Sequence, residues 1–154
     1  MRRLAPSLLL AVVALMAFPV LSHAAATRAE YVAQAEPICG LANDDIQRLN
    51  QRFHRFHEKG RYGSAGRVLK RTGTRLSKSI EQVRAITPPP GEEQTIASWL
   101  DLVQGIADNN VRLGRAESHR RFSRVSKIET RNEAIAKQAD ALVADWGFHA
   151  CAGQ

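Results

Sequence analysis

The chain has 154 residues, of which 24% are charged and 6% aromatic, and its formal net charge is +7. This length suits one domain with a core of ordinary size. Two cysteines without a C-x-x-C motif exclude a cysteine-rich metal scaffold and a dithiol redox motif.

Residues 1–26 have the pattern of a secretory signal peptide. Arg2 and Arg3 precede an apolar run, and small residues follow it, with cleavage expected near Ala24–Ala26. The apolar run falls short of the roughly 20 residues that span a bilayer, which disfavours a retained membrane anchor. We therefore expect a secreted, periplasmic or cell-envelope protein with no transmembrane segment after signal removal. Residues 27–154 would form a single domain.

Cys39 and Cys151 are 112 residues apart. Export places them in a compartment that permits disulfides, and an even cysteine count favours pairing. The sequence therefore predicts a Cys39–Cys151 disulfide.

The first mature segment shows helical periodicity. Proline removes a backbone donor and clashes with the preceding turn, so Pro37 predicts a kink or a fresh helix start. Residues 60–66 contain three glycines and predict the first break, with Ser64 as the N-cap of the next helix. Apolar residues recur at steps of three and four: Ile38, Ala42, Ile46, Leu49, Phe53 and Phe56.

Three further helices are predicted. The second ends at the proline run 88–90, and the third opens at Gly91 with acidic residues in its first turn. A turn is expected within 114–121, and Gly147 ends the fourth helix. Trp99 and Trp146 are predicted to anchor the core.

Short connections between amphipathic helices favour antiparallel neighbours. The predicted fold is therefore all-α, an antiparallel up-down-up-down four-helix bundle with one disulfide. In this topology the start of the first helix and the end of the fourth lie at one end, which is where the two cysteines fall. Two polar residues, Asn110 and Asn132, fall on the apolar seams, where they either fix the register or lie at the edge of the core.

Positive charge is concentrated in two blocks. Residues 48–78 contain ten basic side chains against Glu58 alone, and residues 112–131 contain seven against two acids. The predicted topology places both blocks at the end opposite the cysteines. That end is a candidate surface for an anionic polymer, lipid head groups or an acidic protein. Its candidate residues are Arg52, Arg55, Lys59, Arg61, Arg67, Lys70, Arg71, Arg115, Arg120, Arg121 and Arg124.

His54 and His57 are three residues apart and could share a helix face as metal ligands. No third ligand is evident, so they are a weak metal candidate and no cofactor is predicted. The sequence has no G-x-S-x-G motif, no phosphate-binding glycine loop and no haem-attachment motif. A catalytic site and a small-molecule substrate are therefore not indicated, and the protein is predicted not to be an enzyme.

The segments EYVAQAEPICGLAND and WGFHAC, with the proline run between them, resemble a group of small exported all-helical proteins of high-GC bacteria. The resemblance implies compartment and fold, and it implies no activity. The favoured hypothesis is a non-enzymatic exported bundle that binds an anionic or protein partner through its basic end. The alternatives are a metal- or cofactor-handling bundle that uses His54 and His57, and a purely structural module.

Overall fold

The computed structural model describes residues 26–152, and these residues form helices without any strand. The helices are α1 (Arg28–Glu58), α2 (Tyr62–Arg84), α3 (Glu93–Ser118) and α4 (Phe122–Val143), followed by a short 3-10 helix, η1 (Ala144–Trp146). The prediction of four helices in an all-α chain is confirmed. The predicted signal peptide lies, apart from Ala26, outside the described residues.

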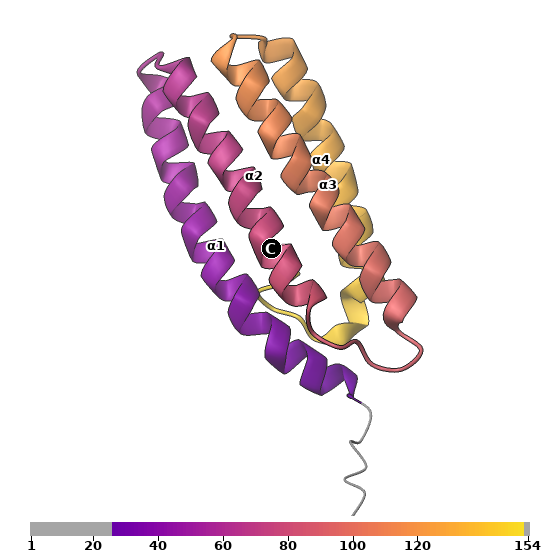
Figure 1. Cartoon of the computed structure of the whole chain (residues 1–154). Helices are drawn as coiled ribbons and strands as arrows, with labels where there is room; N and C mark the ends of the chain where they lie inside the picture. Colours follow the sequence, from indigo (N-terminus) through magenta and orange to yellow (C-terminus); the bar gives the residue numbers. More distant parts are fainter. Residues whose placement is uncertain (1–25, 153–154) are drawn as a thin grey trace, which may run out of the picture.

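The N-terminus of α1 is fixed by a capping box. The Thr27 hydroxyl accepts a hydrogen bond from the Glu30 backbone N–H at 3.2 Å, and the Glu30 carboxylate accepts one from the Thr27 backbone N–H at 2.8 Å. Pro37 lies inside α1, so the helix does not restart there, and α1 follows a bowed path in Figure 1. Ala35 and Ala42, before and after Pro37, are buried, and the helix continues through the proline although its backbone donor is missing.

The connection between α1 and α2 is shorter than the glycine spacing predicts. Because α2 begins at Tyr62, Ser64 lies in its first turn and is not the N-cap. The Ser64 hydroxyl instead accepts a hydrogen bond from the Arg67 guanidinium at 3.0 Å. The residue at the N-cap is Arg61, whose side chain forms no capping hydrogen bond.

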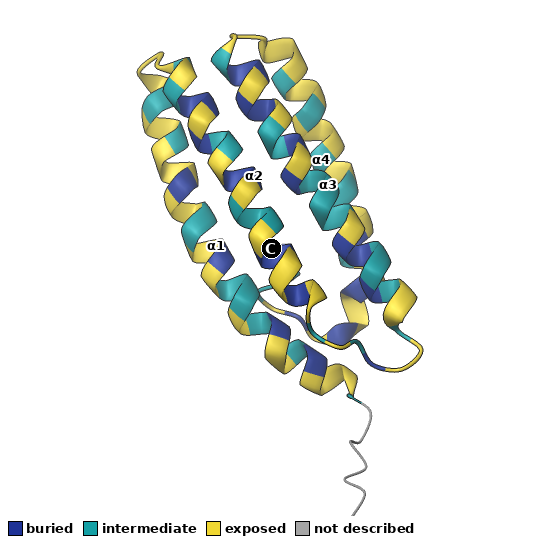
Figure 2. Cartoon of the chain, in the orientation of Figure 1, coloured by how far each residue is buried: buried dark blue, intermediate teal, exposed yellow. Residues whose placement is uncertain are grey.

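Each helix packs against the next one in the chain. In Figure 1 the α1–α2 and α3–α4 connections lie at one end, and the α2–α3 connection lies at the other. Contacts join α1 to α2, α2 to α3 and α3 to α4, but no Cα atoms of α1 and α4 lie within 8 Å of each other. Consequently α4 is the least buried helix, with only Ala139 and Val143 fully buried, and Figure 2 shows it largely in the colours of exposed and intermediate residues.

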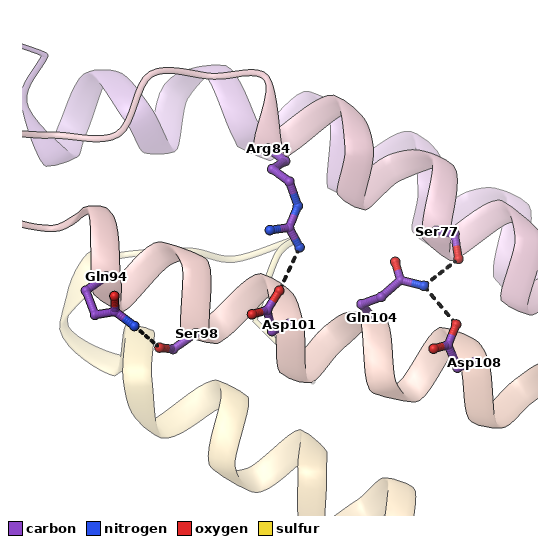
Figure 3. Close-up of polar contacts among 7 residues, drawn as sticks. All are labelled: Ser77, Arg84, Gln94, Ser98, Asp101, Gln104 and Asp108. Carbon is purple, nitrogen blue, oxygen red and sulfur yellow. Dashed lines mark hydrogen bonds and ion pairs between the residues drawn. The ribbon is translucent and has the colours of Figure 1, made fainter.

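The tightest contact is between α2 and α3. A Cβ atom on Gly73 would lie 2.5 Å from the Ala107 carbonyl oxygen, and one on Gly66 would lie 2.2 Å from the Gly114 carbonyl oxygen. These glycines let the two backbones approach closely. A polar rim lines the same interface in Figure 3, where Arg84 pairs with Asp101 at 2.9 Å and Gln104 donates to Ser77 at 3.0 Å.

The core lies toward the end where the C-terminal segment crosses from α4 to α1 (Figure 1). Trp99 and Trp146 are 3% and 8% exposed, which confirms both as core residues. Phe148 stacks on Trp99, with ring centroids 5.2 Å apart, and Tyr31 meets Trp146 edge-on at 5.9 Å. Burial raises the pKa of Tyr31 to about 12, which the nearby Arg84 charge only partly opposes.

Candidate anion-binding surface

The Cys39–Cys151 disulfide is confirmed, with Cα atoms 5.1 Å apart. The prediction that the two cysteines lie at helix ends was wrong. Cys39 lies about three turns into α1, and Cys151 lies beyond η1. Gly147, in a left-handed conformation with φ 78°, ends η1 and turns the chain back toward α1. We call the opposite end, where the connections 59–61 and 119–121 lie, the basic end.

Arginine side chains from α1 and α2 line an open groove that leads to the basic end. It consists of two adjoining hollows, of 410 Å³ and 360 Å³, that share Leu49, Arg52 and Arg71 in their linings. The apolar floor includes Leu49, Phe56 and Val68. We call this feature the α1–α2 groove, and its arginines are Arg48, Arg52, Arg61, Arg67, Arg71 and Arg75.

A separate hollow of 390 Å³ lies between α3 and α4. It contains the N-cap of α4, Arg121, where no side chain caps the free backbone donors of the helix. We call it the α3–α4 hollow. Its lining is almost entirely basic: Arg112, Arg115, His119, Arg121 and Arg124, with Ala116.

The structure divides the predicted basic residues between these two places. Arg52, Arg61, Arg67 and Arg71 line the α1–α2 groove, and Arg115, Arg121 and Arg124 line the α3–α4 hollow.

The remaining four predicted residues line neither feature. Arg55 and Lys59 are exposed beside the groove. Lys70 lies with its stem against Gly114, and the Arg120 guanidinium lies 5.1 Å from the centre of the Tyr62 ring. The prediction omitted Arg48, Arg75, Arg112 and His119, which also line the groove or the hollow. Which residues face these features depends on how each helix is rotated about its own axis, and charge counts along the chain do not show this.

Asp45 neutralises one end of the α1–α2 groove. It forms ion pairs with Arg48 and with Arg75, and a hydrogen bond from Arg48 is the main reason that the pKa of Asp45 is lowered. The pairing crosses from α1 to α2, so a count of charges along the chain does not detect it. Asp45 brings one negative charge against Arg48 and Arg75, so the positive charge of the groove is carried mainly by Arg52, Arg61, Arg67 and Arg71.

A partly buried hydrogen-bonded pair lies at the basic end. Glu117 is 0% exposed, and one of its carboxylate oxygens accepts a hydrogen bond from His57 Nδ1 at 2.7 Å. Its other oxygen has no hydrogen-bond partner among the described residues. Tyr62 and Phe122 meet the His57 ring edge-on at 5.5 Å and 6.3 Å. Sequence reasoning missed this pair, because 60 residues separate its members.

The structure brings no metal ligands together around His54 and His57. His57 is engaged by Glu117, while His54 is exposed and contacts Phe53. Within residues 26–152, no cluster of three or more His, Cys, Asp or Glu side chains is placed to hold a metal ion.

Searches with protein-family models, among curated proteins and among solved structures find no match to this chain. In the described part of the chain, no helix combines the length and the apolar character needed to cross a bilayer.

Proposed function

We propose that the protein is a non-enzymatic, exported, antiparallel up-down-up-down helical bundle that binds an anionic partner through its basic end. The observation that carries the proposal is the gathering of arginines into the α1–α2 groove and the α3–α4 hollow, where only Asp45 offers opposing charge. Guanidinium groups bind carboxylate and phosphate groups through paired hydrogen bonds. The partner classes are an anionic polymer, lipid head groups or an acidic protein.

Export is the second part of the proposal. The predicted cleavage site precedes Thr27, and Thr27 is the residue that caps α1, so removal of residues 1–26 would leave every described helix intact. The disulfide requires an oxidising compartment such as the periplasm or the cell exterior. Mass spectrometry of the protein recovered from culture should find an N-terminus at Thr27 or Ala25, and an intact N-terminus would contradict the proposal.

Heparin retention across a salt series tests anion binding. The four-arginine variant carries two substitutions in the α1–α2 groove, Arg52→Gln and Arg71→Gln, and two in the α3–α4 hollow, Arg115→Gln and Arg124→Gln. A matched control removes four exposed charges outside both features: Lys78→Gln, Lys127→Gln, Arg131→Gln and Lys137→Gln.

We expect the four-arginine variant to elute at much lower salt than the wild type, and the control to elute at nearly the same salt as the wild type. Equal elution of the two variants would mean that net charge alone drives retention, and the proposal would fail.

A further inference from the structure

The α1–α2 groove has a regular spacing of positive charge. Arg67, Arg71 and Arg75 are each four residues apart on α2, and Arg48 and Arg52 are four apart on α1. Four residues advance about 6 Å along a helix, so the arginines form two parallel rows with one charge per turn. A phosphodiester chain carries one negative charge on every repeat unit, so it presents a regular series of charges to these rows.

The shape of the groove selects a narrow ligand. It lies between two packed helices, whose axes are typically about 8–10 Å apart, and its floor is formed by Leu49, Phe56 and Val68. A duplex or a bilayer presents a broad surface, which matches a groove between two packed helices poorly. A single flexible strand can lie along the floor between the two rows.

We infer that the α1–α2 groove binds a single-stranded phosphodiester chain, whose successive phosphates pair with the uncompensated arginines Arg52, Arg61, Arg67 and Arg71. This inference rests on the proposed function and narrows it to one groove and one ligand chemistry. Two of these arginines are already held in place, because Arg61 lies 5.0 Å from the centre of the Phe56 ring and Arg67 bonds Ser64 at 3.0 Å. Asp45 marks one end of the track, where its single negative charge offsets part of the positive charge of Arg48 and Arg75.

The probe is a fluorescein-labelled oligothymidylate of about 12 nucleotides, a length within the range that single-strand binding folds cover. The groove variant carries Arg52→Gln and Arg71→Gln, the arginines common to both parts of the groove. The matched control carries Arg115→Gln and Arg124→Gln in the α3–α4 hollow and has the same net charge. Fluorescence anisotropy across a salt series gives the affinity and its salt slope.

We expect the groove variant to lose about 10–100-fold in affinity at low salt, and its log–log salt slope to become shallower by about 1.4, since each phosphate contact contributes about 0.7. The control variant should lose less than about threefold. Asp45→Asn should tighten binding and steepen the slope, because it frees Arg48 and Arg75. Circular dichroism and thermal unfolding of each variant check that the fold is retained.

Competition defines the ligand. An abasic phosphodiester chain of the same length should displace the probe as well as oligothymidylate does, because phosphates carry the recognition. Failure of the abasic chain to compete would overturn the inference, and so would binding of anionic phosphatidylglycerol vesicles without binding of the oligomer.

The two proposals fail in distinguishable ways. If the control variant weakens binding as much as the groove variant does, the groove inference is wrong while anion binding at the basic end stands. If the wild type is retained on neither heparin nor the oligomer at low salt, the proposed function itself is wrong.

Discussion

Glu36 accepts hydrogen bonds from three consecutive backbone N–H groups of the C-terminal segment, those of His149, Ala150 and Cys151, at 3.0 to 3.2 Å. Burial by itself would raise the pKa of Glu36, but these hydrogen bonds outweigh it and hold the pKa below its ordinary value of 4.5. A carboxylate whose pKa is lower in the folded state stabilises the fold above its unfolded pKa, and that contribution is lost as the pH falls through the folded pKa.

Glu36→Gln should therefore lower the free energy of unfolding by about 1–2 kcal/mol at pH 7, because a neutral amide oxygen replaces a charged acceptor. The difference from the wild type should shrink as the pH falls below 4.5, where the wild-type carboxylate becomes protonated. Urea unfolding at a series of pH values measures both effects. The exposed Glu129→Gln serves as the control and should show neither, and a pH-independent difference for Glu36→Gln would contradict the assignment.

The buried pair of Glu117 and His57 makes a second prediction at this scale. Glu117→Ala should lower the free energy of unfolding by about 2–3 kcal/mol. This loss is smaller than the loss expected when a fully buried pair is broken, because the His57 side chain is 43% exposed. His57→Ala should also destabilise the fold, since it leaves a buried carboxylate without its partner.

A double-mutant cycle measures how far the two residues depend on each other. The double variant should be more stable than the sum of the single effects implies, with a coupling of about 1–2 kcal/mol. Strictly additive effects would mean that the 2.7 Å contact contributes nothing to folding.

Among the elements, α2 and α3 form the closest pair, and glycine makes that approach possible. Gly73 faces the backbone of α3, with no room for a Cβ atom, whereas a Cβ on Gly105 would meet only the end of the Ile135 side chain at 3.9 Å. The same substitution should therefore have opposite effects at the two positions.

Gly73→Ala should destabilise the protein by about 1–3 kcal/mol, because the helices must separate to admit the methyl group. Gly105→Ala should stabilise it by up to about 1 kcal/mol, since alanine has the higher helix propensity and meets no obstacle. Chemical denaturation of the two variants compares them directly. If both substitutions stabilise the protein, the tight α2–α3 contact is not present in solution.

Local signals were sufficient to predict much at the level of elements. Helical periodicity located four helices, and the proline run located the α2–α3 connection. Gly147 was predicted to end the fourth helix, but α4 ends at Val143 and Gly147 ends the short helix η1 that follows it. The prediction of Ser64 as N-cap was wrong, because α2 starts one turn earlier at Tyr62. Of the two alternatives predicted at Pro37, a kink or a fresh helix start, the fresh start does not occur, since α1 continues through its proline. Periodicity also did not single out the buried Asn109, whose side-chain amide donates a hydrogen bond to Asn132 at 2.8 Å.

The candidate site was only partly predictable for a related reason. Charge blocks along the chain showed which helix segments are basic, and seven of the proposed arginines line the groove or the hollow. Pairings across helices require a register that periodicity does not supply. The neutralisation of Arg75 by Asp45 and the Glu117–His57 pair are of this kind.

For the molecule as a whole, the two ends are closed by different means. At the basic end, side chains of the aromatic cluster around His57 bring the start of α4 close to α1 and α2. At the other end the C-terminal segment crosses to α1 and is fixed there by the disulfide and by Glu36. Cys39 and the end of α1 are about 28 Å apart along the helix, so the two ends are structurally separate.

This separation makes a final prediction for Cys39→Ser with Cys151→Ser. The disulfide closes a loop of more than 100 residues, so its loss should lower the free energy of unfolding by about 4–5 kcal/mol in the chain-entropy model. Tryptophan emission should shift to longer wavelength as the segment carrying Phe148 leaves Trp99. Helix content should change little, because the close backbone contacts of α2 with α3 at Gly66 and Gly73 do not involve the C-terminal segment.

Heparin retention should survive in this variant below its unfolding temperature, since the arginines of the α1–α2 groove lie on helices that remain paired. The control is the wild type under the same non-reducing conditions. Loss of retention in a variant that keeps its helix content would show that the C-terminal closure sets the spacing of α1 and α2 along their whole length, and the two ends would then have to be treated as one mechanically coupled unit.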